Sequence, residues 1–334
     1  MAEAAEPSGE TSGKCVDEFE LIRRFFLQQE EGEGVLIGIG DDGAVVTQAP
    51  DRDLVAVVDT LIEGVHYPLN FPAPDVGFRA VAVNLSDIAA MGATPKWMTL
   101  ALTLSEADES WLTGFAAGLF EAAREYGVAL IGGDTTRGTQ TVISVQLLGE
   151  VRSNAILTRA GAKPGDGIYV TGTVGDAAGG LALLKDASGR DLDSDDEYLT
   201  RRFSRPAARV AFGASVARIA TAAIDVSDGL GTDLEKLLRA SGVAGTIDLA
   251  LLPVSAQLRR KFGHDQAVDF ALDGGDDYEL CFTAKSADHV RLKELALPER
   301  LAITRIGEVG QGAGLNCVRG GRTAPYQDRG YRHF

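Results

Sequence analysis

The sequence is poor in cysteine, and the few cysteines it has are scattered. Cys15, Cys281 and Cys317 are odd in number, far apart and without the CxxC spacing of a zinc site. Such cysteines are typical of a reducing compartment and not of a disulfide framework. We therefore expect a cytoplasmic protein.

The sequence also lacks long apolar runs and an excess of positive charge. No stretch approaches the roughly 20 apolar residues of a membrane-spanning helix, and the N-terminus has no basic-then-apolar signal pattern. We expect residues 1–15 to form a disordered tail. The net charge of −16 and the pI near 4.7 argue against nucleic acid or an acidic membrane as a partner.

The chain is long and apolar enough for two folded units. With 334 residues, 45% of them hydrophobic, two domains of about 150 to 180 residues are expected. We place the N-terminal domain at residues 16–151 and the C-terminal domain at residues 152–334.

Apolar periodicity predicts intermixed strands and helices, the pattern of an α+β or α/β fold. The predicted strands are 35–39, 54–59, 97–104, 142–151, 222–226, 278–283 and 302–309. The predicted helices are 16–26, 76–91, 109–126, 206–220, 229–241 and 287–296. The acidic segment 191–197 is interpreted as a solvated loop.

Six aspartates lie just past strand-like apolar runs or on the helices that follow them: Asp42, Asp59, Asp87, Asp134, Asp225 and Asp228. Too few basic residues lie nearby in the sequence to pair them all. Carboxylates gathered at one edge of a sheet repel one another unless a cation joins them. Mg²⁺ suits this arrangement because it takes oxygen ligands and shares them with phosphates. For one aspartate alone, a helix cap or a turn is the simpler interpretation, and Asp228 before Gly229 fits it.

Other polar residues also admit two interpretations. Asn84 and Asp87 share one face of a mostly apolar helix, where a metal or phosphate partner would explain them. Arg159 fits a phosphate clamp or a surface ion pair. His66 fits a functional or a packed histidine. The glycine-rich loop 172–180 is either a phosphate-binding helix start or a tight turn, and it is not a Walker A loop.

Seven segments together resemble the thiamine-monophosphate kinase family: 38–42, 59–66, 82–93, 130–138, 157–166, 224–229 and 274–282. The resemblance covers nearly the whole chain. It implies ATP-dependent phosphorylation of thiamine monophosphate to thiamine diphosphate, on the fold shared with aminoimidazole ribonucleotide synthetase and selenophosphate synthetase. It also implies a homodimer whose N-terminal sheets pair into a barrel, with a sandwich-like C-terminal α/β domain completing the active-site cleft.

The resemblance assigns roles to residues of this chain. It implies Asp42, Asp59, Asp87, Asp134 and Asp225 as ligands of several Mg²⁺ ions, and Asp228 as a further ion ligand. ATP contacts would come from Gly133, Asp134, Arg159 and Ser227. Thiamine monophosphate contacts would come from His66, Asp276 and the C-terminal position of Asp328. No residue is expected to act as a nucleophile or a base, because the acceptor phosphate is largely ionised at neutral pH.

The sequence departs from the family pattern at three places. Val57 and Val58 precede Asp59 where hydroxyl residues are frequent, so one ion would lose a side-chain ligand. Asp276 replaces a longer glutamate. Asp328 stands where an aromatic residue often stacks on the substrate, and Tyr326 would replace that residue only if the loop shifted.

Two other functions remain open at this stage. A selenophosphate synthetase-like enzyme would need a reactive N-terminal cysteine, for which Cys15 is the candidate, although its flanking sequence does not match. A non-catalytic metal or nucleotide sensor would use the acidic edge without turnover. Consumption of ATP with and without thiamine monophosphate separates all three.

Overall fold

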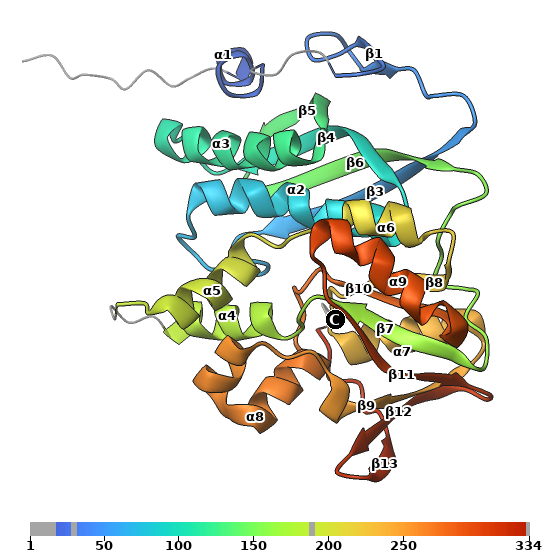
Figure 1. The fold of residues 1–334 in the computed structure, drawn as a ribbon. Helices are drawn as coiled ribbons and strands as arrows, with labels where there is room; N and C mark the ends of the chain where they lie inside the picture. Colours follow the sequence, from blue (N-terminus) through green and yellow to red (C-terminus); the bar gives the residue numbers. More distant parts are fainter. Residues whose placement is uncertain (1–17, 28–31, 187–190, 332–334) are drawn as a thin grey trace, which may run out of the picture.

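A computed structural model describes residues 18–27, 32–186 and 191–331 of the chain (Figure 1). The predicted N-terminal tail and Cys15 lie outside these ranges. The described strands form a four-stranded sheet from the first half of the chain, a seven-stranded sheet from the second half, and a short ribbon of β1 (Val35–Ile37) and β2 (Val45–Val46). No helix among the described residues is both long and apolar enough to cross a membrane.

The four-stranded sheet has the strand order β3-β6-β4-β5. Its strands are β3 (Arg52–Ile62), β6 (Val142–Arg152), β4 (Thr94–Leu104) and β5 (Ala129–Arg137). The first three pair antiparallel, and β5 runs parallel to β4. The strands predicted within β3, β4 and β6 are confirmed; β3 extends beyond both predicted ends, β4 begins earlier and β6 ends one residue later.

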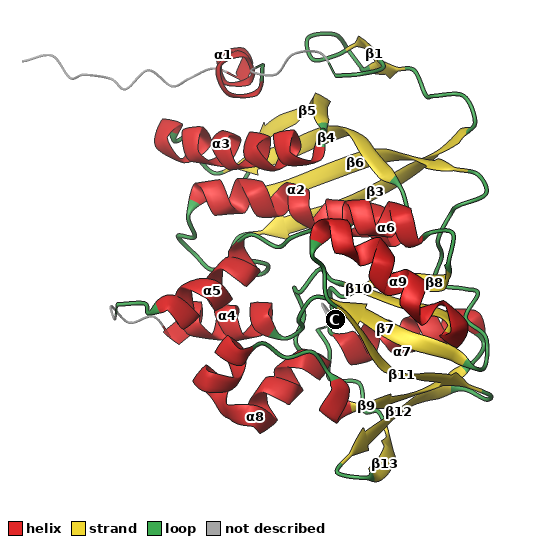
Figure 2. Cartoon of the chain, in the orientation of Figure 1, coloured by secondary structure: helices red, strands yellow, loops and turns green. Residues whose placement is uncertain are grey.

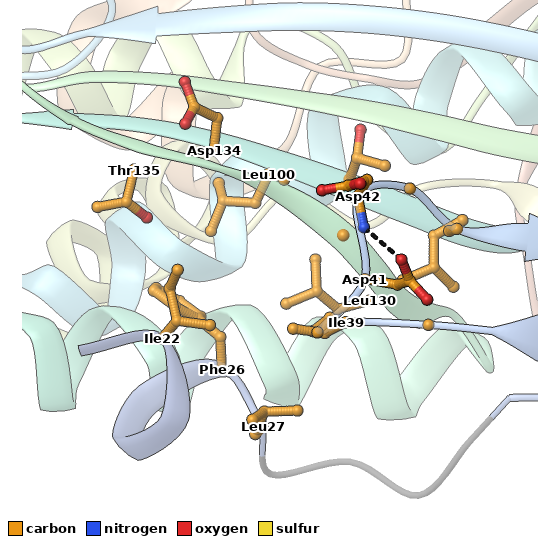
Figure 3. A pocket seen from close by; sticks show the side chains of 18 of the residues that line it. Ile22, Phe26, Leu27, Ile39, Asp41, Asp42, Leu100, Leu130, Asp134 and Thr135 are labelled. Carbon is orange, nitrogen blue, oxygen red and sulfur yellow. Dashed lines mark hydrogen bonds between the residues drawn. The ribbon is translucent and has the colours of Figure 1, made fainter. Parts of the chain in front are cut away.

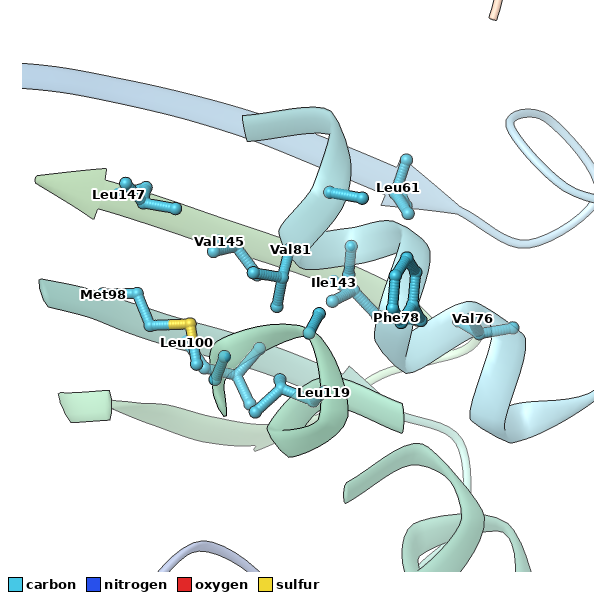
Figure 4. Close-up of a cluster of buried hydrophobic side chains, with 14 of the residues drawn as sticks. Leu61, Val76, Phe78, Val81, Met98, Leu100, Leu119, Ile143, Val145 and Leu147 are labelled. Atoms are coloured by element: carbon cyan, nitrogen blue, oxygen red, sulfur yellow. The ribbon is translucent and has the colours of Figure 1, made fainter. Parts of the chain in front are cut away.

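Two long helices, α2 (Ala73–Ala90) and α3 (Glu109–Tyr126), cover one face of this sheet (Figures 1 and 2). Both helices were predicted. Asp108 caps the start of α3 through the backbone N–H groups of Ser110 and Trp111, and Gly127 ends it in a left-handed conformation. Figure 4 shows Val81 of α2 and Leu119 of α3 packing against Met98 and other apolar side chains of the sheet.

The opposite face of the four-stranded sheet is open in the single chain. Along β3, alternate residues are exposed, including Leu54 at 48% and Val58 at 61%. Ala101 of β4 and Gln146 of β6 continue this exposed face. The strands therefore alternate between a helix-covered face and an apolar open face, and the sheet does not close into a barrel within one chain.

The seven-stranded sheet has the strand order β13-β12-β9-β11-β7-β10-β8. Its strands are β7 (Asp166–Thr171), β8 (Ala220–Asp225), β9 (Ala244–Asp248), β10 (Leu280–Lys285), β11 (Ile303–Gly310), β12 (Gly314–Arg319) and β13 (Arg322–Pro325). The helices around it are α4 (Asp176–Asp186), α5 (Ser194–Ser204), α6 (Val210–Val216), α7 (Leu230–Ser241), α8 (Ala256–Asp273) and α9 (His289–Ala296). Strands β9, β12 and β13 and helix α8 were not predicted.

Three predicted segments differ from the structure. The acidic segment 191–197 is not a solvated loop, because α5 begins within it. Asp193 and Asp196 form a capping box there, and Lys261 of α8 binds both carboxylates. The predicted helix 206–220 shortens to α6, and the described part of 16–26 divides into α1 (Glu18–Leu21) and a π-helix, η1 (Ile22–Phe26).

Helices α2 and α3 approach closely because glycine lies at their contact. A Cβ atom on Gly118 would lie 1.8 Å from the carbonyl oxygen of Pro74, and one on Gly77 would lie 2.0 Å from that of Phe115. No side chain fits at these distances without moving one helix backbone.

We expect Gly118→Ala to lower the free energy of unfolding by about 2 kcal/mol or more, because separating the helices costs more than the gain in helix propensity. Gly114→Ala on the same helix is the control. Its Cβ would meet only side-chain atoms of Pro74 and Ala73, at 3.1 and 3.2 Å. Urea unfolding of both variants is the measurement, and equal stabilities would contradict the close contact.

Candidate functional site

The six aspartates do not form one cluster in the single chain. Asp42 and Asp134 line a cavity of about 640 Å³, which we call the glycine-loop pocket. The other four, Asp59, Asp87, Asp225 and Asp228, line a larger cavity of about 1010 Å³, which we call the acidic pocket. The predicted set is therefore divided between two places.

The glycine-loop pocket combines apolar side chains with glycine-rich backbone. Ile22, Phe26 and Leu27 line one side, and the loop 38–44 and residues 130–135 of β5 line the others (Figure 3). Gly133 is required here, because a Cβ would lie 1.9 Å from the carbonyl oxygen of Leu100 on the neighbouring strand. An apolar wall beside glycine-rich backbone and two carboxylates suits a flat ring that carries phosphates.

Four elements bring the carboxylates of the acidic pocket together. Asp59 comes from β3, Asp87 from the last turn of α2, Asp225 from the end of β8, and Asp228 from the turn before α7. The pocket thus joins the two sheets of the chain. Asp225 is 4% exposed and accepts a hydrogen bond of 2.8 Å from the hydroxyl of Ser86 in α2.

These carboxylates raise one another's pKa values. Burial and then repulsion from Asp59 raise the pKa of Asp87 to about 6, although the charge of Arg159 opposes the change. Burial and then Asp87 raise the pKa of Asp225 well above its usual range. Burial and then Asp228 raise the pKa of Asp59. Ionised at neutral pH, the cluster is destabilising unless a cation joins it.

The folded chain places more basic side chains around the acidic pocket than the residues next to these aspartates in the sequence indicated. Five basic side chains line the acidic pocket: Arg79, Arg159, Lys185, Lys236 and Arg329. Among the described residues, Asp228 is the only one of the four predicted aspartates here that forms an ion pair, in keeping with the expectation that they cannot all be paired. Lys236 contacts Asp228 at 2.5 Å and Asp233 at 2.8 Å. No comparable ion pair within the described residues involves Asp59 or Asp225.

Asp233 organises the turn that carries two predicted site residues. One oxygen of its buried carboxylate accepts the backbone N–H groups of Ser227 at 3.0 Å and of Asp228 at 2.9 Å. The turn is thereby fixed at the start of α7. Ser227 also accepts the N–H of Asp276 through its carbonyl oxygen at 2.9 Å, which ties this turn to the loop 275–279.

The donor set of the acidic pocket fits Mg²⁺ in its chemistry. Carboxylate oxygens are the ligands that Mg²⁺ prefers, and a divalent cation would relieve the repulsion that raises the pKa values of Asp59, Asp87 and Asp225. In the part of the chain that the structure describes, no three His, Cys, Asp or Glu side chains are arranged to hold one ion.

Asp134 is separated from Asp59 by the strand order. Asp59 pairs with Val145, Val145 with Leu100, and Leu100 with Gly133, so these residues share one face of the sheet. Asp134, the next residue, faces the open side. Two strands lie between β3 and β5, so the backbones are about 14 Å apart. One ion that binds oxygen at about 2.1 Å cannot contact both side chains of a single chain.

The remaining predicted site residues fall into two groups. His66, Arg159, Ser227 and Asp276 all line the acidic pocket. The Nδ1 atom of His66 accepts the backbone N–H of Ile62 at 3.0 Å, which orients the ring. Gly133 lines the glycine-loop pocket and so lies apart from Arg159 and Ser227.

Asp328 does not line the acidic pocket. Its carboxylate accepts hydrogen bonds from the hydroxyl of Thr232 at 2.6 Å and from the N–H of Gly330 at 3.1 Å, and so shapes the C-terminal segment. Tyr326 is turned toward α8, where its hydroxyl donates to Asp273 at 3.0 Å. Among the described residues of this segment, Tyr331 is the aromatic residue that lines the pocket, and it is 48% exposed.

Hydrogen bonds correct the interpretation of Asn84 and decide between the two interpretations of the loop 172–180. Asn84 needs no metal or phosphate, because its Oδ1 accepts the N–H of Asp59 at 3.0 Å and its Nδ2 donates to Ala80 at 3.0 Å. The loop 172–180 is a capped turn, because the buried Asp277 accepts the N–H of Gly175 at 2.6 Å and the N–H of Ala177 at 3.3 Å. The start of α4 is therefore already occupied by a carboxylate.

Sequence reasoning missed Arg79, Lys185, Lys236, Arg329 and Tyr331 as pocket residues. Only Arg79 carried a usable signal, because it is the one charged residue of the apolar stretch 76–83 in α2. The argument applied to Asn84 and Asp87 would have found it. The others lie on solvent-compatible segments, where a basic residue needs no special explanation.

We expect Asp87→Asn to stabilise the metal-free protein at pH 7.5 by about 1 kcal/mol, because it removes one of the carboxylates that repel one another. Thermal unfolding in EDTA is the measurement. Asp75→Asn is the control: Asp75 pairs with Arg205 at 2.6 Å, so its loss should lower stability or leave it unchanged. A less stable Asp87→Asn protein would contradict the repulsion.

The comparisons with known proteins cover nearly the whole chain. Residues 40–151 match the family model of the AIR synthase related protein, N-terminal domain, and residues 163–319 match that of the C-terminal domain. Thiamine-monophosphate kinase of Escherichia coli K12 is 43% identical over 95% of this chain and 98% of its own length. That of Bacillus subtilis is 35% identical over 96% of this chain and 100% of its own length.

Solved structures give the same picture. A thiamine-monophosphate kinase from Stenotrophomonas maltophilia K279a is 45% identical, with a TM-score of 0.82 over 89% of this chain and 94% of that one. "AaThiL complexed with AMPPCP and TMP" is 33% identical, with a TM-score of 0.77 over 95% of this chain and 97% of that one. The hydrogenase maturation protein HypE of E. coli, at 21% identity and a TM-score of 0.74 over 92% of this chain and 96% of that one, shares the fold alone.

Proposed function

The chain belongs to the thiamine-monophosphate kinase family, and from that membership we propose that it transfers the γ-phosphoryl group of ATP to thiamine monophosphate, giving thiamine diphosphate. The observation that carries the proposal is similarity along the full chain to the protein solved with AMPPCP and TMP. The acidic pocket agrees with it, because thiamine carries a positively charged ring that carboxylates attract.

Thiamine monophosphate is proposed to bind in the acidic pocket. Asp276 and His66 line it near Arg79, and Tyr331 offers an exposed aromatic ring. An aromatic face and a carboxylate are the two groups that best receive a cationic heterocycle. Tyr331 is therefore a better candidate for stacking than Asp328 or Tyr326, whose side chains are engaged elsewhere.

Several Mg²⁺ ions are proposed to be held by the aspartates, with Asp59, Asp87 and Asp225 as the central set. When bound, Mg²⁺ would neutralise the phosphates of both substrates and the surrounding carboxylates. Val57 and Val58 offer no side-chain oxygen beside Asp59. Asp228 is the weakest candidate, because Lys236 already neutralises it.

The residues of the chain bind and orient the two substrates and do not react covalently. Arg159 is exposed on the acidic pocket and offers a guanidinium for phosphate oxygens. The acceptor phosphate is largely ionised at neutral pH, so no base is needed to remove a proton. In direct in-line transfer, the protein has only to align the two phosphates and stabilise their charge, and no side chain reacts.

A homodimer formed through the open face of the four-stranded sheet is proposed to complete the ATP site. Within one chain, Asp134 and Asp59 lie on opposite faces and about 14 Å apart at the backbone. Arg159 and Ser227 line a different pocket from Gly133 and Asp134. A second copy bound to the open face would bring its own edge strands next to the sheet of the first chain. The predicted ATP and metal ligands, which one chain holds in two separate pockets, would then come together from two chains.

We expect wild-type protein to consume ATP only with thiamine monophosphate and a divalent metal, and EDTA to abolish turnover. Asp134→Asn should lower kcat by roughly 100-fold or more, because it removes a proposed metal and ATP ligand. Its thermal stability should be nearly unchanged, because Asp134 is exposed. ATP consumption without thiamine monophosphate, full activity in EDTA, or a trapped phosphoenzyme would overturn the proposal.

We expect Val58→Lys to convert the proposed dimer into a monomer, because it places a charge in the middle of the open face. Val290→Lys on α9 is the matched control, because Val290 is 68% exposed and Val58 is 61% exposed. Light scattering after size exclusion measures the mass of each. If Val58→Lys keeps the wild-type mass, or if the wild type is itself a monomer, the open face is not the interface.

A further inference from the structure

Arg79 is one of the most deeply buried charged residues of the chain, and it borders the acidic pocket. Its side chain is 1% exposed and comes from the middle of α2. Its Nη1 atom donates to the carbonyl oxygen of Phe203 at 2.6 Å, and its Nη2 atom donates to Oδ1 of Asp276. The guanidinium also stacks on Phe203, with its carbon 4.3 Å from the ring centre, and lies 5.5 Å from the ring centre of Tyr278.

Burying a guanidinium costs several kcal/mol unless its partners compensate. Here the compensation is incomplete, because the buried Nε atom has no hydrogen-bond partner among the described residues. Asp276 and Asp59 are the carboxylates whose charges favour the charged form of Arg79. An apolar residue at this position of α2 would carry no desolvation cost. Burial of a guanidinium here therefore indicates that Arg79 has a role beyond packing.

The contacts on Asp276 show what Arg79 does to that carboxylate. Nη2 of Arg79 and the hydroxyl of Tyr278, at 3.1 Å, both bind Oδ1. No hydrogen bond from the described residues reaches Oδ2. Two donors on one oxygen fix the rotation of the carboxylate and leave the other oxygen for a ligand in the pocket. Asp276 is 28% exposed, so that oxygen is accessible.

The backbone of the loop that carries Asp276 is also fixed by specific hydrogen bonds. Asp276 has a φ of 68° and Tyr278 a φ of 52°, a left-handed conformation that costs a non-glycine residue about 1 kcal/mol or more. The N–H groups of these residues donate to the carbonyl oxygens of Ser227 and Val226, both at 2.9 Å. The loop is thus strained, and side-chain contacts such as that of Arg79 help to hold it.

Helix α2 connects this loop to the carboxylate cluster. Arg79, Val83 and Asp87 are four residues apart in turn, so they form one stripe of the helix, and all three line the acidic pocket. The charge of Arg79 also acts on Asp59 and lowers its pKa against the effect of burial. One rigid helix therefore carries the cluster at one end and the anchor of Asp276 at the other.

We propose that Arg79 is a positioning residue for substrate recognition: it holds Oδ1 of Asp276, so that Oδ2 faces the cationic part of thiamine monophosphate. The inference rests on the proposed function. It explains how an aspartate serves where a longer glutamate is frequent, because a short side chain reaches a ligand only if its direction is fixed. Arg79 itself need not touch the substrate.

The test compares Arg79→Met, Arg79→Lys, Asp276→Asn and the double variant Arg79→Met/Asp276→Asn. Arg79→Met should raise the KM for thiamine monophosphate by roughly tenfold, equivalent to about 1.4 kcal/mol, and change the KM for ATP less than about twofold. Arg79→Lys keeps the charge but not the fork geometry, so its KM should lie between those of the wild type and Arg79→Met. The double variant should be no worse than Asp276→Asn alone, because both act through one contact.

Arg205→Met is the matched control. Arg205 is 17% exposed, pairs with Asp75 and Glu121, and stacks on Phe78 at 5.0 Å, but it does not line the acidic pocket. It should lower the unfolding temperature without changing either KM. Equal changes in both KM values for Arg79→Met, or additive effects in the double variant, would overturn the positioning role. If Arg79→Met does not fold, Arg79→Lys and Tyr278→Phe, which removes the second donor to Oδ1, give the same comparison.

The outcome also separates this inference from the proposed function. If the wild type fails to turn over thiamine monophosphate with ATP, the proposed function is wrong. If the wild type is active and the Arg79 variants keep the wild-type ratio of the two KM values, only the role of Arg79 is wrong.

Discussion

Mutual repulsion among buried carboxylates is the constraint on which the arrangement of this protein depends. Burial makes Asp59, Asp87 and Asp225 reluctant to ionise, and a neighbouring carboxylate adds to the effect in each case: Asp228 at Asp59, Asp59 at Asp87, and Asp87 at Asp225. The fold offsets this locally. Asn84 ties the backbone of Asp59 to α2, and Ser86 donates to Asp225 from the same helix. Nearby cations engage the outer members of the group, Lys236 at Asp228 and Arg79 at Asp276.

Helix α2 is the element that makes these offsets possible. Its apolar side packs on the four-stranded sheet (Figure 1), and its residues Arg79 and Asp87 line the acidic pocket together with Asp59 of β3 and Asp225 of β8. The close contact with α3 fixes the position of the helix against the sheet. Packing in the first half of the chain thus determines where the charged residues of α2 lie relative to the pocket-lining aspartates of the second half.

The sequence was sufficient for most of the secondary structure and for the aspartates that line the two pockets, but not for the basic residues of the acidic pocket or for the separation of the two pockets. Strand-end aspartates are visible as residues after apolar runs, and α3 was bounded correctly because Asp108 and Gly127 mark its ends. Strand order is a long-range property, so the distance between Asp59 and Asp134 had no local signal. The acidic start of α5 was missed for a related reason, since its neutralising Lys261 lies on a distant helix.

The open face of the four-stranded sheet affects the risk of aggregation of the newly synthesised chain. In the single chain, Leu54 and Val58 meet water beside the unpaired edges of β3 and β5. An exposed sheet face with large apolar side chains and two unpaired edge strands is a surface that promotes aggregation. If the proposed dimer covers this face, the interval between synthesis and assembly is when the chain is most prone to misassociation, and rapid assembly would then protect it as added stability does.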